Sequence, residues 1–296
     1  MTSTVGGSCM KVLVTGAEGM LGTDLCQVME QEHEVLPVGS NDMDVRDRDA
    51  VRKKTTDSDP DLVVHLAALT DVDRCEREPK QAFLTNTIGT QNVVLACQEL
   101  DIPIVYVSTI SVFDGTKPEP YTEFDQPNPR SYYSLSKYQA ERIVRSLLQR
   151  YYIIRAGWMF GGGEKDKKFI ARILTLARDR SEVRVVNDKF GSPTYTVDFA
   201  RGIMALIATG QYGVYHMVNT GQPASRYAVA RAVLEYADIT HCNLTTVSSA
   251  EFPLPAPRPR MEAGRNLAAE LIGLPPMRPW QEALEEYVRT VLRKIS

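Results

Sequence analysis

Residues 11–22 read KVLVTGAEGMLG and join a short apolar run to three glycines spaced as GxxGxxG. At a strand-to-helix junction, one glycine allows the tight turn, one lets the backbone approach a pyrophosphate, and one lets the helix pack close to the strand. The free amides and the dipole at the start of the helix then favour phosphate. The segment therefore predicts a dinucleotide-binding loop, although a plain strand–helix turn would use the same glycines. The residues expected to contact the cofactor here are Gly16, Gly19, Met20, Leu21 and Gly22.

Apolar runs of similar length recur downstream and alternate with amphipathic helical patterns. Strands are expected at 11–16, 34–39, 62–68, 104–109 and 151–157, and helices at 20–31, 48–56, 79–100 and 132–150. The strand candidates are apolar nearly throughout, which is typical of strands covered on both faces. Alternating strands and helices predict a parallel sheet with right-handed crossovers, so the fold class is a doubly wound α/β sheet.

The alternation stops after Trp158. Glycine- and lysine-rich, helical and proline-rich stretches follow, and a terminal helix is expected from about Pro279. Such material is poor at extending the sheet, and it predicts a smaller lobe that closes over the carboxyl edge of the strands. We expect residues 10–160 with 192–217 to form the dinucleotide-binding domain, 161–191 with 218–296 the substrate lobe, and 1–9 a disordered extension.

The composition restricts the class of protein and its partners. The chain has 296 residues, 43% hydrophobic and 24% charged, with a net charge of −3 and no basic block, so neither nucleic acid nor a membrane is expected as a partner. Its five cysteines show no CxxC pair, and its four histidines show no ligand pattern. These features predict free thiols in a reducing, cytoplasmic compartment, and no metal site. The start of the chain does not look like a signal peptide, and no apolar segment approaches the roughly 20 residues that span a bilayer.

Tyr133 and Lys137 lie four residues apart at the start of an expected helix, a spacing that places both side chains on one face. A neighbouring ammonium is expected to lower the pKa of the phenol from about 10, which suits a proton-transfer group. Thr109 ends the fourth expected strand, where its hydroxyl could bind a substrate carbonyl together with the tyrosine; an ordinary strand-end residue is the alternative. Asn86 is either a support for the lysine or a surface residue.

The second expected strand ends at Gly39 and is followed by Ser40 and Asn41, with no acidic residue before Asp42. An acid at the strand end usually binds the ribose 2′-hydroxyl of NAD. Its absence favours NADPH slightly over NADH, although no arginine stands in the same loop to bind a 2′-phosphate.

Together these segments resemble an extended short-chain dehydrogenase/reductase, and more closely the dTDP-4-dehydrorhamnose reductase family. The resemblance runs from Met10 to the terminal helix and is carried by AALT at 67–70 with VD at 72–73, ST at 108–109 followed by VFDG at 112–115, Arg155 with Trp158, and FGSPTY at 190–195. It implies a Rossmann fold, an NADPH or NADH cofactor, and reduction of the C4 keto group of a nucleotide-activated 6-deoxysugar. The default substrate is dTDP-4-dehydro-L-rhamnose, and a homodimer is possible.

Carried over position by position, the resemblance implies proton transfer and carbonyl binding by Thr109, Tyr133 and Lys137, adenine contacts by Asp44 and Val45, pyrophosphate and ribose contacts by Leu66, Ala67 and Ala68, and sugar contacts by Val72, Ser111 and Trp158. Trp158 could instead be a core aromatic. Lys168, with Lys165, Lys167 and Arg172, forms either a clamp for the nucleotide diphosphate or a solvated helix start.

Three positions depart from the family pattern. Ile110-Ser111 replaces Asp-Tyr, Ser134 replaces a glycine, and Lys168 replaces an asparagine. The loss of that tyrosine could reshape the sugar pocket. A 4,6-dehydratase or 4-epimerase is a related alternative, although no acidic pair follows Thr109 as in dehydratases. A non-catalytic, NADP-binding regulatory subunit similar to the β subunit of methionine adenosyltransferase is the alternative from another class.

Overall fold

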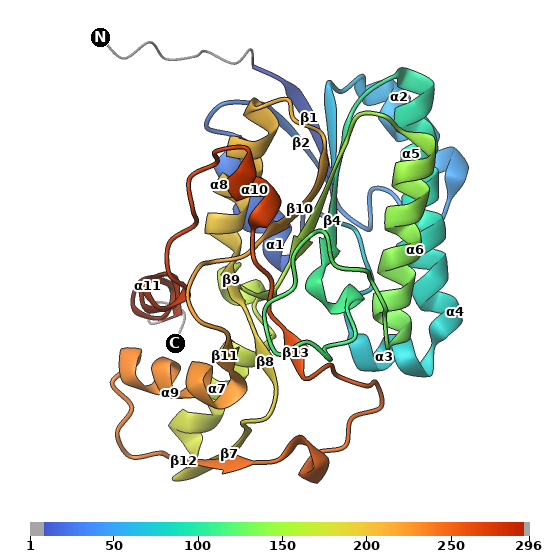
Figure 1. Cartoon of the computed structure of the whole chain (residues 1–296). Coiled ribbons are helices and arrows are strands. Elements are labelled where there is room, and N and C mark those ends of the chain that lie inside the picture. Colours follow the sequence, from blue (N-terminus) through green and yellow to red (C-terminus); the bar gives the residue numbers. More distant parts are fainter. Residues whose placement is uncertain (1–8, 293–296) are drawn as a thin grey trace.

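Residues 9–292 are described by the computed structural model, and at their centre lies a six-stranded parallel sheet (Figure 1). The strand order is β10-β5-β4-β3-β1-β2. This sheet confirms the predicted doubly wound α/β class. Of the expected extension at residues 1–9, only Cys9 belongs to the described part. The strands are β1 (Lys11–Thr15), β2 (Glu34–Val38), β3 (Leu62–His65), β4 (Ile104–Thr109), β5 (Tyr151–Ala156) and β10 (Gly213–Met217).

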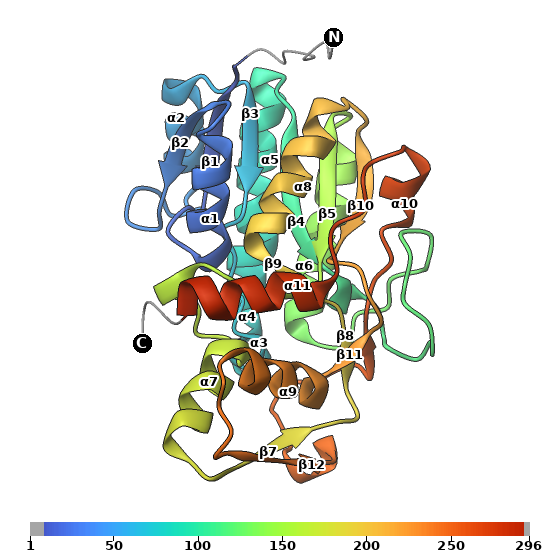
Figure 2. The ribbon, with the colours of Figure 1, turned by 90° about the vertical axis from the view of Figure 1, so that its left-hand side faces the viewer.

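The sheet is covered on both faces, as Figure 2 shows for one of them. Helices α1 (Met20–Met29) and α8 (Thr196–Ala208) pack on the face that buries Val12 and Val14. Leu13 points to the opposite face, where α2 (Arg48–Ser58), α5 (Gly89–Leu100) and α6 (Tyr132–Leu147) lie. Because both faces are apolar, the polar residues of the strands lie mainly at or near their ends.

The chain turns in opposite directions after β1 and after β3, which lie side by side. From β1 it crosses to β2 at one edge of the sheet, and from β3 it continues to β4 and β5. In doubly wound sheets, such a switch point opens a crevice at the carboxyl ends of the strands. The glycine loop after β1 and residues 66–70 after β3 border this crevice.

Strand β10 extends the sheet beyond β5. The sequence analysis assigned its residues to the dinucleotide-binding domain but did not identify them as a strand. The strand is short and carries His216, which is fully buried and hydrogen-bonded to the Tyr121 carbonyl. A buried histidine in a five-residue strand hides the apolar pattern. Helix α10 (Leu267–Leu271) also packs on the sheet side, through Ala269, although it falls in the segment assigned to the lobe. The proposed division of the chain into two domains stays a prediction.

Below the carboxyl edge lies a smaller layer of helices and strand pairs (Figure 1). Helices α7 (Phe169–Asp179) and α9 (Arg226–Tyr236) pack over the parallel pair β7 (Glu182–Val186) and β12 (Asn243–Val247). Within residues 9–292, no helix combines the length and apolar character needed to cross a membrane. The remaining elements used below are β6 (Trp158–Phe160), β8 (Phe190–Gly191), β9 (Pro193–Tyr195), β11 (Ala224–Ser225), β13 (Met261–Glu262), α3 (Val72–Arg77), α4 (Pro79–Ala82), the π-helical turn η1 (Phe83–Ile88), the 3-10 turn η2 (Ile110–Val112), α11 (Trp280–Glu286) and the final turn η5 (Tyr287–Leu292).

His65 forms a buried polar link between β1, β3 and α5. The Thr90 hydroxyl donates to the Asn86 carbonyl at 2.7 Å, so it accepts from His65 Nε2 at 3.0 Å. His65 Nδ1 is then the acceptor for the Thr15 hydroxyl at 2.7 Å. A neutral imidazole satisfies both partners. Burial, together with the Lys137 ammonium, lowers the pKa of His65 to about 3.

We therefore expect His65 to make the fold sensitive to acid. The unfolded chain binds a proton at this residue below about pH 6.5, whereas the native protein does not until about pH 3. The contribution of His65 to the free energy of unfolding is fully present above about pH 6.5. It decreases by about 1.4 kcal/mol per pH unit as the pH falls below that value. In urea unfolding between pH 7 and pH 4.5, His65→Gln should reduce this slope, and the same substitution at exposed His241 is the matched control. An identical slope in both variants would contradict the assignment.

Candidate active site

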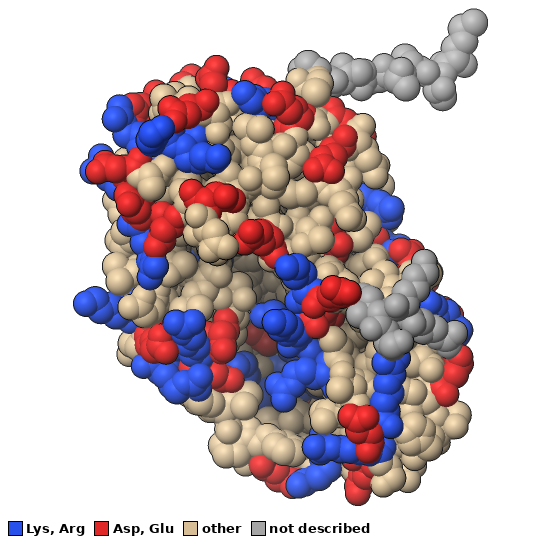
Figure 3. All heavy atoms as spheres, turned by 180° about the vertical axis from the view of Figure 1, so that it is seen from behind, with Lys and Arg blue, Asp and Glu red and all other residues tan. Residues whose placement is uncertain are grey.

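A cleft of about 1000 Å³ opens at the carboxyl edge of the sheet and extends toward α7 and α9. Figure 3 shows Lys and Arg side chains gathered around the hollow. Every residue predicted for the site lines this single cleft, which places the phosphate loop, the tyrosine–lysine pair and the expected sugar contacts together. These residues are Gly16, Gly19, Met20, Leu21, Gly22, Asp44, Val45, Leu66, Ala67, Ala68, Val72, Thr109, Ser111, Tyr133, Lys137, Trp158 and Lys168.

The glycine loop is shaped so closely that side chains do not fit. Gly16 has φ +71°, and a Cβ there would lie 2.7 Å from the Ala67 amide nitrogen. A Cβ on Gly22 would lie 2.5 Å from the Gly16 carbonyl oxygen. Gly19 caps α1 without any side-chain hydrogen bond, and the first turn has no acidic residue. The amides and the positive end of the helix dipole therefore face the cleft, and the loop fits the pyrophosphate of a dinucleotide.

At the far end of the cleft, the loop after β2 brings Asp44, Val45 and Arg46 to the surface expected to bind the adenosine. The Asp42 carboxylate, the first acid after β2, accepts from the Gly39 amide at 2.8 Å and so closes its own loop. Arg46 pairs with Asp44 at 2.6 Å, and this hydrogen-bonded pairing lowers the pKa of Asp44. The sequence analysis considered an arginine only in the loop directly after β2. It therefore missed Arg46, which lies beyond that loop.

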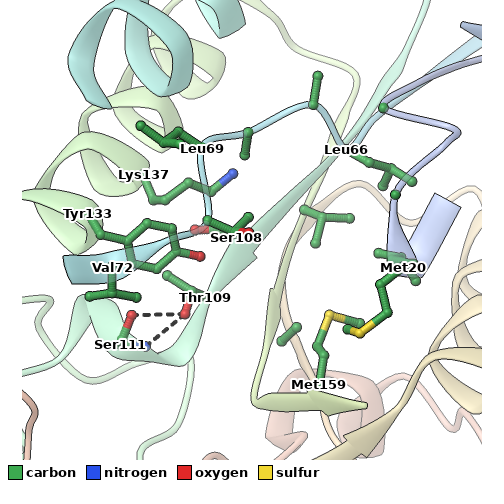
Figure 4. Close-up of a pocket in the computed structure, with 18 of the residues that line it drawn as sticks. Met20, Leu66, Leu69, Val72, Ser108, Thr109, Ser111, Tyr133, Lys137 and Met159 are labelled. Atoms are coloured by element: carbon green, nitrogen blue, oxygen red, sulfur yellow. Dashed lines mark hydrogen bonds between the residues drawn. The ribbon is translucent and has the colours of Figure 1, made fainter. Parts of the chain in front are cut away.

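Two elements, β4 and α6, bring Thr109, Tyr133 and Lys137 together. Thr109 is the last residue of β4, and the other two lie in the first turns of α6, which Ser131 caps. In Figure 4, the Tyr133 phenol and the Thr109 hydroxyl point into the same space, with Lys137 just above them. The Lys137 ammonium lies 4.3 Å from the centre of the Tyr106 ring, a cation–π contact beneath the cleft.

The ionisation of this group differs from the expectation. Burial raises the pKa of the Tyr133 phenol, and the hydrogen bond from Thr109 opposes this shift only in part. Burial also lowers the pKa of Lys137 to about 7, against the effect of the Glu141 carboxylate. The expected lowering of the tyrosine pKa was wrong because the loss of hydration on burial dominates the shift. Tyr133 is therefore held as a protonated phenol, a proton donor.

Asn86 is fully buried in the π-helical turn η1, so the reading as a surface asparagine was wrong. Its side-chain oxygen accepts from the Leu69 amide at 2.7 Å. Its amide nitrogen donates to the Leu69 carbonyl at 3.1 Å and to the Ser136 hydroxyl at 3.0 Å. Asn86 thus fixes the loop after β3 against Ser136 of α6, the residue that precedes Lys137. It supports the lysine indirectly, through this neighbour.

The other wall of the cleft comes from the smaller layer. Trp158 is half-buried in β6, and its indole donates to Glu262 at 3.0 Å, with the Arg226 guanidinium stacked 3.5 Å from the ring centre. The sequence reading singled out Trp158 but missed both partners. Lys168 is exposed, and its ammonium reaches Thr70 across the cleft at 3.3 Å. The other expected members of its cluster, Lys165, Lys167 and Arg172, are exposed and do not line the cleft.

Comparisons with known proteins agree with this arrangement. A family model described as RmlD substrate binding domain matches residues 10–293. The chain is 37% identical to the spore coat polysaccharide biosynthesis protein SpsK of Bacillus subtilis, over 94% of this chain and 97% of that protein. It is 35% identical to the dTDP-4-dehydrorhamnose reductase of Mycobacterium tuberculosis, over 94% and 92%. The crystal structure of dTDP-4-dehydrorhamnose reductase from Bacillus anthracis in complex with NADP superposes with a TM-score of 0.91 at 35% identity, covering 94% of this chain and 98% of that one.

The position of Arg46 yields a test of cofactor preference. An arginine in this region can bind a 2′-phosphate, so Arg46→Ala should raise KM for NADPH by about tenfold and leave KM for NADH nearly unchanged. The matched control is Arg52→Ala, which removes an exposed, ion-paired arginine from α2. Equal effects on the two cofactors would exclude Arg46 as the phosphate ligand.

Proposed function

The chain belongs to the RmlD substrate binding domain family, and on that premise we propose that it is an NADPH-dependent reductase of the C4 keto group of a nucleotide-activated 6-deoxysugar, with dTDP-4-dehydro-L-rhamnose as substrate. The observation that carries the proposal is the convergence of a protonated Tyr133 and the Thr109 hydroxyl on one point of a cleft that also holds a dinucleotide loop.

In the proposed mechanism, bound NADPH supplies the hydride. Tyr133 donates its phenolic proton to the C4 oxygen, and the hydroxyl of Thr109 donates a hydrogen bond to the same oxygen as negative charge develops on it. Lys137 lies on the same helix face, where it binds the ribose and stabilises the phenolate that remains. Because burial keeps the tyrosine protonated, the resting site is ready for reduction.

Arg226 supports the assignment of a diphosphate-bearing substrate. Burial lowers the pKa of its guanidinium to about 10, so the group stays cationic at neutral pH although it has lost much of its hydration. It is stacked between Trp158, at 3.5 Å, and Phe169, at 4.9 Å, while Glu262 provides the neighbouring negative charge. Stacking fixes the guanidinium plane and leaves its edges for an anion, which is the geometry that arginine uses to bind phosphate. Lys168, at the rim, would add a second positive charge.

The proton donor is tested by Tyr133→Phe. NADPH oxidation in the presence of a dTDP-4-dehydro-6-deoxysugar should fall by about 10³-fold, while NADPH binding stays nearly intact, because only the proton donor is lost. Tyr132→Phe, at the exposed neighbouring position, should match the wild type. Full turnover by Tyr133→Phe would disprove the assigned proton donor. A wild-type protein that binds NADPH tightly but oxidises it with no keto-sugar would favour the regulatory-subunit alternative.

The diphosphate site is tested by Arg226→Met, which keeps an apolar stem against Trp158. Losing charge-assisted hydrogen bonds of about 1.5–3 kcal/mol should raise KM for the nucleotide sugar by about 10- to 100-fold, with KM for NADPH unchanged. Arg231→Met, on the exposed face of the same helix, is the matched control. If KM rose equally for the cofactor, Arg226 would be a general structural residue and not a substrate ligand.

A further inference from the structure

Four side-chain hydroxyls form a continuous hydrogen-bonded chain that ends beside Tyr133. Ser131 and Ser134 lie 2.9 Å apart, Ser134 donates to Ser111 at 3.1 Å, and Ser111 and Thr109 lie 2.9 Å apart. The chain runs from the buried start of α6, through the turn η2, to the end of β4. Ser111 and Ser134 are two of the positions at which this sequence departs from the family pattern, and here they contact each other.

The direction of these hydrogen bonds follows from counting protons. Each hydroxyl has one proton to donate. Because Ser134 uses its proton for Ser111, Ser131 must be the donor to Ser134. Four protons serve three contacts, so one proton is left over, on either Ser111 or Thr109. Those two are the half-buried members, and both line the cleft. The chain therefore ends in a donor on the cleft side, next to the Tyr133 phenol, with which Thr109 also forms a hydrogen bond.

Thr109 is held from a second direction as well. Its hydroxyl oxygen accepts from the Ser111 backbone amide at 3.2 Å, besides its contact with the Ser111 hydroxyl. Figure 4 shows both contacts running from Thr109 to Ser111, below the Tyr133 ring. When Ser111 donates to Thr109, the lone pairs of Thr109 face Ser111, and the remaining Thr109 proton faces the cleft. Hydrogen bonds in such a series polarise one another, which strengthens the terminal donor.

We propose that Ser134 and Ser111 are positioning residues that orient the Thr109 hydroxyl as a hydrogen-bond donor to the carbonyl oxygen of the substrate. The inference rests on the proposed reductase function and adds to it the residues that set the donor direction. No proton is transferred along the chain, since Tyr133 gives up the proton and Thr109 only stabilises the developing charge. Ser131 serves a second purpose by capping α6, so it is unsuitable for a test.

The test compares Ser111→Ala, Ser134→Ala and the double variant. Each single variant should lower kcat by about tenfold, less than the 10²- to 10³-fold typical of deleting an oxyanion donor, because the Ser111 amide still contacts Thr109. KM for NADPH and the melting temperature should stay unchanged. The double variant should also lose about tenfold, since both residues act through one chain, and Ser111→Thr, which keeps the hydroxyl, should restore kcat. Ser146→Ala, on the exposed face of α6, is the control.

Three outcomes separate this inference from the function on which it rests. Single variants with wild-type kcat, or a double variant whose loss is the product of the single losses, would overturn the positioning role while leaving the reductase intact. A wild-type enzyme inactive toward the keto-sugar would overturn the function instead. Crystal structures of the wild type and of Ser134→Ala test the series of hydroxyl hydrogen bonds directly. In the wild type we expect a single Thr109 rotamer that is hydrogen-bonded to Ser111. In Ser134→Ala we expect loss of that contact or a second Thr109 rotamer. An unchanged Thr109–Ser111 contact in the variant would refute the proposal.

Discussion

The position of the reacting groups depends on one buried carboxylate. Glu141 in α6 is 1% exposed and accepts from Arg155 Nε at 3.0 Å, from Arg155 Nη2 at 2.7 Å and from the Ser108 hydroxyl at 2.5 Å. These bonds fix α6 against β4 and β5. Tyr133, Lys137 and Glu141 follow one another at intervals of four residues on the same helix face. Fixing Glu141 to Ser108 therefore sets Tyr133 opposite Thr109, the next residue of β4. A buried ion pair adds little net stability, but it specifies geometry here, because losing one partner strands the other charge.

The same ion pair influences the charges around it. The Arg155 guanidinium lies 5.2 Å from the centre of the Phe113 ring and 3.5 Å from the His216 imidazole of β10. Burial, with the Arg155 charge, lowers the pKa of His216 to about 3, so the histidine is neutral. Glu141 in turn opposes the lowering of the Lys137 pKa. The polar groups behind the cleft thus form a buried network around the Glu141–Arg155 ion pair. Within it, burial lowers the pKa of Lys137 to about 7 and raises the pKa of Tyr133, which stays protonated. This setting suits a site that must supply a proton.

The sequence predicts the cofactor side of the cleft better than the substrate side, for a physical reason. The glycine loop and the Tyr133–Lys137 pair are local patterns whose spacing determines their geometry. Arg226 begins α9 and Glu262 lies in the two-residue strand β13, and they meet Trp158 only after the chain has folded back over the sheet edge. Nothing near them in sequence distinguishes them from surface charges. Strand β10 was missed because a buried histidine broke its apolar run, and the direction of the tyrosine pKa was missed because burial cannot be read from spacing.

The contents of the cleft also argue for reduction over elimination of water from the sugar. A dehydratase needs a second acid–base pair near the hydride site, because a hydroxyl and a carbon-bound proton must both leave. Here Thr109 is followed by Ile110, which is 1% exposed, and by the Ser111 hydroxyl. Among the described residues that line the cleft, the only acids are Glu18 in the phosphate loop, Asp44 paired with Arg46, and Glu262 bonded to the Trp158 indole. None is a free carboxyl beside Tyr133. The site is equipped to place one proton and one hydrogen bond on a single oxygen, and this is the chemistry that carbonyl reduction requires of the protein.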